Sequence, residues 1–174
     1  MNRKLAVILI AFVVLAGLLL LRRGPSSNLP LGVAAPPIQA AGWLQGTAPS
    51  PDELKGRVVV LDAFGYWCGP CRAAAPELVE VFQRYSPQGV IFLGITPDGE
   101  ESLTEIREFL QDTKITWRIG YGAEPTLVAY NVQYFPTVIV IGGDGRIIWT
   151  SDERGSLPVA LDRALRATAS QDSP

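Results

Sequence analysis

The stretch Trp67-Cys68-Gly69-Pro70-Cys71 contains the only two cysteines of this 174-residue chain. A mostly apolar, β-branched run at residues 57–64 leads straight into it, a pattern typical of a strand covered on both faces. After the stretch, apolar residues recur at helical spacing as far as Tyr85. The cysteines therefore lie where a strand passes into a helix, and in that context their spacing indicates redox chemistry.

The rest of the chain alternates between strand and helix signals and ends on a hairpin and a helix. Residues 90–95 complete a β-α-β unit, and Gly142-Gly143-Asp144-Gly145 carries the Asp-Gly signal of a hairpin. This order predicts an α/β fold with a central mixed β-sheet flanked by helices on both faces. The further expected elements are helices at 102–113, 124–130 and 157–167 and strands at 117–120, 137–141 and 146–150.

The first 23 residues are unlike the rest of the chain. The run from Leu5 to Leu21 is apolar throughout and as a helix is about 26 Å long, the short end of what spans a core of roughly 30 Å. We expect residues 1–23 to be an uncleaved anchor with a transmembrane helix. The alternative is a cleaved signal peptide, whose apolar region is usually shorter. Basic residues flank the run on both sides, so charge alone favours neither orientation.

Composition divides the remaining chain into three parts. Residues 24–35 are rich in Gly, Pro and Ser, which disfavour helix and strand, and are expected to be a flexible tether. Residues 36–168 have the length and apolar content of one folded domain. Residues 169–174 are polar and are expected to be a frayed tail.

Charge and composition exclude several kinds of function. All seventeen acidic residues lie beyond residue 23 with eleven of the fifteen basic ones, so this part carries a charge of −6 and nucleic acid is not an expected partner. Histidine is absent, which removes the usual general base and metal ligand. Zinc would need two ligands besides the cysteines, so no metal site is expected. An inert structural bridge is the other alternative to redox chemistry.

The spacing of Cys68 and Cys71 suits exchange between thiols and disulfides. If Cys68 precedes the helix, its thiolate faces unpaired N–H groups and the positive end of the helix dipole, which favour the anion. We expect Cys68 to be the exposed nucleophile that attacks a disulfide in another protein. Cys71, the shielded thiol, then resolves the mixed disulfide. The redox-active pair is itself the working group, and no cofactor is expected.

The cysteine motif is the active-site sequence of thioredoxins, and three further features resemble the same family. Asp62 matches their buried aspartate, and Pro76 matches the proline that kinks their active-site helix. The segment 130–137 is similar to the one that contains their cis-proline, here Pro136. The resemblance covers about residues 36–167 and implies a thioredoxin fold.

Within that superfamily the chain most resembles the membrane-anchored TlpA/ResA-like thiol–disulfide oxidoreductases. The anchor, the opening Gly32-Val33-Ala34-Ala35-Pro36 and the long stretch between the strand at 90–95 and Pro136 point to this group. That stretch implies an inserted αβ segment. One position departs from the pattern, because Ala74 stands where some members carry an acidic residue. A role that depends on this acid is not carried over.

The residues around the cysteines are expected to move protons, shape the motif or contact a client. Asp62 interrupts an apolar strand, so burial would raise its pKa and let it exchange a proton with Cys71. The alternative is a structural role for Asp62, either at the edge of a strand or paired with a nearby lysine. Two interpretations fit Tyr66 and Tyr134 equally well: part of an apolar rim around the sulfurs, or ordinary aromatic residues of the core or surface. The expected supporting residues are Trp67, Gly69, Pro70 and Pro76, and the expected client groove is Phe135, Pro136 and Thr137.

These features together predict an enzyme, a thiol–disulfide oxidoreductase at the cell membrane with its domain on the extracytoplasmic side. The resemblance implies reduction of exported proteins such as apocytochrome c during cytochrome c maturation. A general disulfide oxidase or isomerase is the alternative among enzymes, and a non-catalytic client-binding module is the alternative of another class. The expected partners are disulfide-containing clients, a membrane thiol electron donor, and the membrane itself through the run from Leu5 to Leu21.

Overall fold

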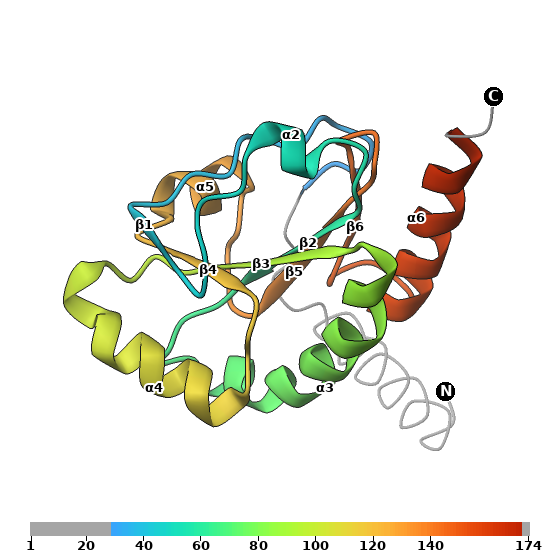
Figure 1. Cartoon of the computed structure of the whole chain (residues 1–174). Coiled ribbons are helices and arrows are strands. Elements are labelled where there is room, and N and C mark those ends of the chain that lie inside the picture. Colours follow the sequence, from blue (N-terminus) through green and yellow to red (C-terminus); the bar gives the residue numbers. More distant parts are fainter. Residues whose placement is uncertain (1–28, 172–174) are drawn as a thin grey trace, which may run out of the picture.

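The computed structural model describes residues 29–171. Its elements alternate along the chain much as the sequence predicts (Figure 1). They are β1 (Gly42–Leu44), α2 (Pro51–Leu54), β2 (Val59–Ala63), α3 (Gly69–Tyr85), β3 (Ile91–Ile95), α4 (Leu103–Thr113), β4 (Arg118–Tyr121), α5 (Glu124–Ala129), β5 (Thr137–Ile141), β6 (Ile147–Thr150) and α6 (Leu157–Gln171), with 3-10 turns at Ser86–Gln88 and Glu100–Ser102.

The strands form one mixed sheet in the order β1-β4-β3-β2-β5-β6. Strand β3 pairs in parallel with β2 and β4, whereas β5 pairs antiparallel with β2 and β6. Helix α4 and strand β4 lie where the inserted αβ segment is expected, and β4 joins the sheet next to β3. The predicted mixed sheet with helices is therefore confirmed, with β2 at its centre.

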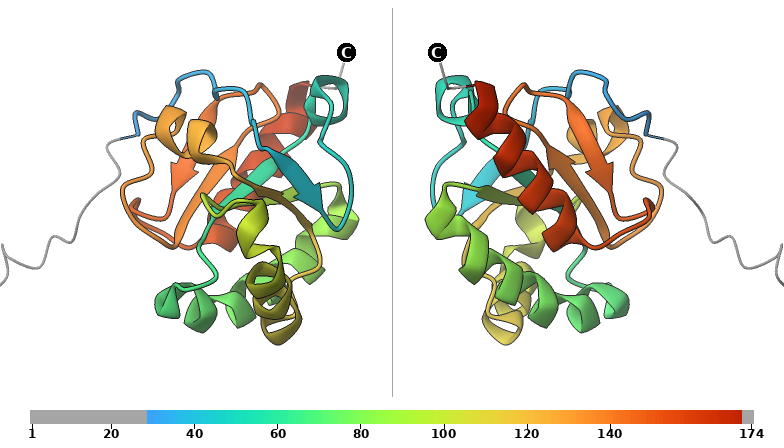
Figure 2. Two further views of the ribbon diagram at one scale, coloured as in Figure 1. Left: turned by 90° about the vertical axis from the view of Figure 1, so that its left-hand side faces the viewer. Right: turned by 90° about the vertical axis from the view of Figure 1, so that its right-hand side faces the viewer.

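Strand β2 is buried on both faces, and its residues alternate between two apolar clusters. Val60 and Phe64 pack with residues of α3, α4 and α6, whereas Leu61 and Ala63 pack with residues of α5. Figure 1 shows α3 and α4 on one side of the sheet and α2 and α5 on the other, and the right-hand view of Figure 2 shows α6 beside α3. Because successive side chains of a strand point to opposite faces, Asp62 lies on the same face as Val60 and Phe64, toward α3.

Residues 32–35, before Pro36, pair with strand β6. The backbone N–H of Gly32 donates to the carbonyl of Ile147 at 2.7 Å, and the N–H of Ile147 donates to the carbonyl of Val33 at 2.9 Å. Residues 32–35 thus pair along the outer edge of β6, whose backbone groups would otherwise lack partners. Residues 32–35 of the expected tether are thus held by edge pairing, which their composition does not predict.

Three further elements differ from the expectation. The sequence does not predict β1 or α2, which are short and carry little periodicity. Pairing with β4, far along the chain, holds β1 in the sheet. Helix α6 continues to Gln171, beyond the start of the predicted polar tail at 169. The hydroxyls of Thr168 and Ser170 donate to carbonyls one turn back, at 3.0 Å and 2.9 Å, so these polar residues fit the helix.

The predicted membrane anchor at residues 1–23 lies outside the described residues. None of the helices within residues 29–171 combines the length and the hydropathy that a membrane crossing requires. The anchor and the orientation of the domain therefore stay predictions.

Candidate active site

Helix α3 begins inside the cysteine motif. Cys68 is its N-cap, with an extended backbone, and the N–H of Cys71 donates to Sγ of Cys68 at 3.1 Å. Gly69 and Pro70 form the first turn, where proline fits because its missing N–H has no helical partner. Pro76 lies within α3, which continues on both sides of it. The local sequence thus places the sulfur of Cys68 at the amino end of a long helix.

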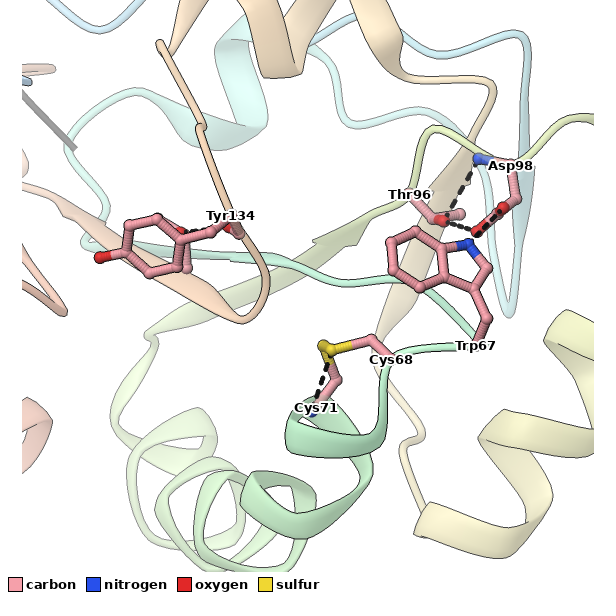
Figure 3. Close-up of a disulfide and its surroundings, with 7 residues drawn as sticks. Trp67, Cys68, Cys71, Thr96, Asp98 and Tyr134 are labelled. Atoms are coloured by element: carbon pink, nitrogen blue, oxygen red, sulfur yellow. Dashed lines mark hydrogen bonds between the residues drawn. A yellow bond between two sulfur atoms is a disulfide. The ribbon is translucent and has the colours of Figure 1, made fainter. Parts of the chain in front are cut away.

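Cys68 and Cys71 form a disulfide, with their Cα atoms 5.2 Å apart (Figure 3). Both residues are 5% exposed, so the difference in exposure that we expected is not seen in this oxidised form. Their neighbours differ instead. Cys71 lines a cavity that also contains Asp62 and Pro136, and Cys68 does not. The asymmetry of the pair therefore lies in what each sulfur faces, not in how much surface it exposes.

Asp62 is the buried acid of the site. Its side chain is 4% exposed, and no residue within 29–171 forms a hydrogen bond or an ion pair with its carboxyl group. Loss of hydration on burial raises the pKa of Asp62 to about 7. The structural alternative placed Asp62 at a strand edge or beside a lysine. Neither is observed, because β2 lies inside the sheet and no residue within 29–171 pairs with the carboxyl group. Asp62 shares a cavity of about 330 Å³ with Cys71.

The loop before β5 adds the third part of the site. The Phe135–Pro136 peptide bond is cis, as the resemblance implies. Thr137 is buried, and its hydroxyl donates to the carbonyl of Tyr134 at 2.7 Å. Pro136 lines the cavity with Asp62 and Cys71, so β5 brings this loop to the cysteines from the other side of β2.

An exposed aromatic side chain stands beside the disulfide. Trp67 is 59% exposed and meets the ring of Phe135 edge-on, with centroids 5.7 Å apart. Its indole Nε1 donates to Oδ1 of Asp98 at 3.0 Å, and Asp98 also accepts from the hydroxyl of Thr96 (Figure 3). Sequence reasoning missed Asp98 and Thr96. The available signal was their position just after a strand that runs parallel to β2, at the same sheet edge as the cysteines.

The two tyrosines have different contacts. Tyr66 is partly buried against the apolar cluster on the α3 face. Tyr134 donates from its hydroxyl to the carboxylate of Asp152, and Figure 3 shows its ring turned away from the disulfide. Of the four aromatic residues, Trp67 is the exposed one, and its ring contacts Phe135. Within residues 29–171 no three potential metal ligands come together.

The sequence of the domain matches a known family over more than half of the chain. Residues 56–147 match the profile of thioredoxin-like proteins. The chain belongs to the thioredoxin-like family. Among solved structures, a thioredoxin-like protein called SPOA0173 superposes with a TM-score of 0.65 at 22% identity, over 81% of this chain and 99% of its own. A putative thiol:disulfide interchange protein DsbE from Chlorobium tepidum superposes with a TM-score of 0.63 at 23% identity, over 81% of this chain and 99% of its own. These likenesses confirm the thioredoxin fold.

Two relatives by sequence come from Rhizobium and Bacillus. Protein FixW of Rhizobium leguminosarum is 28% identical over 164 residues, which cover 86% of this chain and 74% of FixW. Thiol–disulfide oxidoreductase ResA of Bacillus thuringiensis subsp. konkukian is 30% identical over 107 residues, 60% of either chain. The match thus spans 60% of the length of this ResA relative. The described part is a ResA-like thiol–disulfide oxidoreductase domain, and its redox centre is the Cys68–Cys71 pair.

Proposed function

We propose that the whole protein is a membrane-anchored reductant of disulfides in exported proteins, with apocytochrome c among its clients during cytochrome c maturation. The observation that carries the proposal is the placement of the Cys68 sulfur at the N-cap of α3, against the N–H of Cys71. Similarity to proteins named thiol–disulfide oxidoreductase ResA supports the reaction class. The anchor from Leu5 to Leu21 would hold the domain at the extracytoplasmic face, where exported clients pass.

Cys68 is the nucleophile in this proposal. In the reduced protein its thiolate attacks one sulfur of the client disulfide, forms a mixed disulfide with it, and displaces the second client sulfur as a thiolate that takes a proton from water. The amide N–H groups at the start of α3 favour the Cys68 anion, because they carry partial positive charge and lack helical partners. The backbone N–H of Cys71 is one of these groups.

Cys71 and Asp62 complete the reaction. The thiol of Cys71 gives its proton to the carboxylate of Asp62, and the resulting thiolate attacks Sγ of Cys68. The new Cys68–Cys71 bond forms as the bond to the client breaks, and the client leaves as a thiolate. Two electrons have then passed from the cysteine pair to the client. A membrane dithiol donor returns the pair to its reduced form.

The client lies against the loop before β5 in this proposal. Phe135, Pro136 and Thr137 offer a backbone edge to which an extended client segment can add as a strand. Trp67 adds exposed apolar area beside the sulfurs, which suits clients whose disulfide is flanked by apolar side chains.

Trapping of the mixed disulfide tests this function. The Cys71→Ser variant of the full chain, expressed in its native host, should keep clients attached to Cys68, because no second thiol remains to release them. We expect exported proteins with paired cysteines, apocytochrome c-like chains included. The Cys68→Ser/Cys71→Ser variant is the control and should capture nothing.

Each other outcome contradicts a part of the proposal. Capture of cytoplasmic proteins alone would show that the proposed topology is wrong. Capture of many unrelated exported proteins would indicate a general oxidase or isomerase. Capture of none would favour the client-binding module.

A further inference from the structure

The described part of the chain begins beside β6. The guanidinium of Arg146 donates to the carbonyl of Gly32 at 2.6 Å, next to the backbone pairing of Gly32 with Ile147. The seven residues 22–28 separate the expected anchor from Leu29. Seven residues of extended chain span at most roughly 25 Å. In the proposed topology, the margin of the domain at β6 is therefore held close to the lipid surface.

Helix α6 lies on the same side of the domain as β6. Strand β6 ends the sheet order, Figure 1 shows α6 at the same end of the domain, and the right-hand view of Figure 2 looks onto this helix. Val159, Arg163 and Arg166 are exposed and follow one another at intervals of four and three, so they share one face, the α6 face. The one acidic residue of α6, Asp162, accepts from the hydroxyl of Tyr85 at 2.8 Å and so lies toward α3. The α6 face thus carries positive charge without a carboxylate.

A small pocket lies at the start of this face. It measures about 50 Å³, and its lining includes Arg154, Ser156 and Arg163 beside apolar residues such as Ile148 and Ala160. Neither arginine forms an ion pair with a residue within 29–171, and the lining contains no carboxylate. Guanidinium groups match phosphate oxygens in both geometry and charge. Two unpaired guanidinium groups with a hydroxyl at one pocket therefore suit a phosphate group.

Exposed apolar side chains accompany these charges. Within residues 29–171 five large apolar side chains are exposed, and three of them lie at this margin of the domain. Val159 lines the small pocket, and Leu31 and Val33 belong to the segment at the β6 edge. The other two are Trp67 and Val128. Apolar area beside basic side chains is the combination that binds the interface of an anionic bilayer.

We propose that Arg154 and Arg163 bind the phosphate group of an anionic lipid, and that the α6 face docks the domain on the membrane surface. The proposal rests on the anchored topology of the proposed function. Val159 would then lie at the boundary between headgroups and acyl chains. Ser156 lines both this pocket and the cavity beside the cysteine pair. A docked domain therefore holds its cysteines near the membrane, where the proposed dithiol donor lies.

Nuclear magnetic resonance of methyl groups in the oxidised full-length protein, carried in lipid nanodiscs, tests the docking without any turnover. In discs of phosphatidylglycerol with a nitroxide-bearing lipid, the methyl signals of Val159 should broaden several-fold more than those of Val128. Val128 is the internal control, because it is an exposed valine on α5. Discs of phosphatidylcholine, which has no net charge, should remove most of the difference. Equal broadening of both valines in phosphatidylglycerol would overturn the proposal and favour an acidic protein as the partner of the α6 face.

A matched pair of variants tests the pocket. Arg154→Gln/Arg163→Gln should lower the ratio of docked to free domain about 30-fold, because each cation at an anionic membrane surface contributes roughly fivefold. Arg107→Gln/Lys114→Gln removes the same charge at the end of α4 and should change the ratio little. Neither pair lines the cavity beside the cysteines, so both variants should reduce a small soluble disulfide at the unmodified rate. An equal loss of docking in both variants would show an effect of net charge alone and refute the pocket.

Two further measurements separate a lipid from a free anion and docking from anchoring. If inorganic phosphate at matched ionic strength shifts the Val159 signals and abolishes their broadening by lipid, the pocket is a free-anion site and the docking proposal is wrong. If the full chain does not enter the discs, the proposed anchor is wrong, and flotation with phosphatidylglycerol vesicles then decides on docking. Binding that is lost in Arg154→Gln/Arg163→Gln and kept in Arg107→Gln/Lys114→Gln would support the α6 face, and no binding by the unmodified protein would refute it.

Discussion

The indole of Trp67 and the carboxylate of Asp98 are hydrogen-bonded across 3.0 Å, although 31 residues separate them. Trp67 follows β2 and Asp98 follows β3, and these parallel strands end at the same edge of the sheet. Thr96 donates to the other oxygen of Asp98 and so ties it to the end of β3. The orientation of the exposed indole beside the disulfide is therefore set by a neighbouring strand and not by the cysteine motif alone.

Trp67→Phe should weaken client capture while changing stability little. The substitution removes the N–H donor but keeps a ring that can meet Phe135. We expect the free energy of unfolding to fall by about 1 kcal/mol or less, because the bond is exposed, and trapping in the Cys71→Ser background to fall several-fold. Asp98→Ala should reproduce the effect. If the two substitutions together are additive in a double-mutant cycle, the hydrogen bond contributes nothing to capture.

Cys68 should react with alkylating reagents well before Cys71 in the reduced protein. Its sulfur lies at the N-cap of α3, where amide groups favour the thiolate, whereas Cys71 faces the internal cavity. Mass spectrometry of partly alkylated protein across a pH series would measure both rates. Equal rates at all pH values would show that the assignment of nucleophile and resolving cysteine is wrong.

Asp62→Asn should stabilise the oxidised protein at pH 8 and have little effect at pH 4. Burial raises the pKa of Asp62 from 3.8 to about 7, so between these values the folded protein keeps a proton that the unfolded chain has lost. Stability therefore falls as pH rises through this window and stays lowered above it. Asparagine carries no charge, so the variant avoids this loss, which is a few kcal/mol at pH 8. Urea unfolding of the variant and the unmodified protein at both pH values measures this difference in the free energy of unfolding.

The same variant should slow disulfide reduction, because it removes the proton acceptor of Cys71. An equal gain in stability at pH 4 and pH 8 would mean that Asp62 does not titrate as proposed. Unchanged reduction rates over pH 6 to 9 would leave it a structural residue only.

Removal of residues 1–36 should destabilise the domain more than removal of residues 1–31. The longer deletion loses the backbone bonds of Gly32 and Val33 to Ile147, and the bond from the Tyr130 hydroxyl to the carbonyl of Pro36. At about 1 kcal/mol for each bond, the two variants should differ by roughly 2–4 kcal/mol in the free energy of unfolding. Guanidinium unfolding of both measures the difference. Equal values would mean that residues 32–35 contribute nothing to stability.

Local patterns identified most elements and the redox centre. The strand signal before the motif and the helical spacing after it predicted β2 and α3, and the Asp-Gly turn predicted the β5–β6 hairpin. β1, α2 and the pairing of residues 32–35 were missed, because each is short and is held by partners elsewhere in the chain. The end of α6 was missed because its last turn is polar. The hydroxyls of Thr168 and Ser170 donate to the carbonyls of Ala164 and Arg166, so these polar residues fit the helix.

The sequence by itself determined which chemistry this protein has, because two thiols at a strand–helix junction bring together the nucleophile, the resolving group and the helix N-terminus within five residues. Only the tertiary structure decided what surrounds them. The alternation of β2 turns Asp62 toward α3, and the sheet order brings Asp98 to Trp67 and Trp149 to the cavity of Asp62. These partners lie far apart along the chain, so no local periodicity encodes their contact, and the packing of strands and helices around β2 sets it.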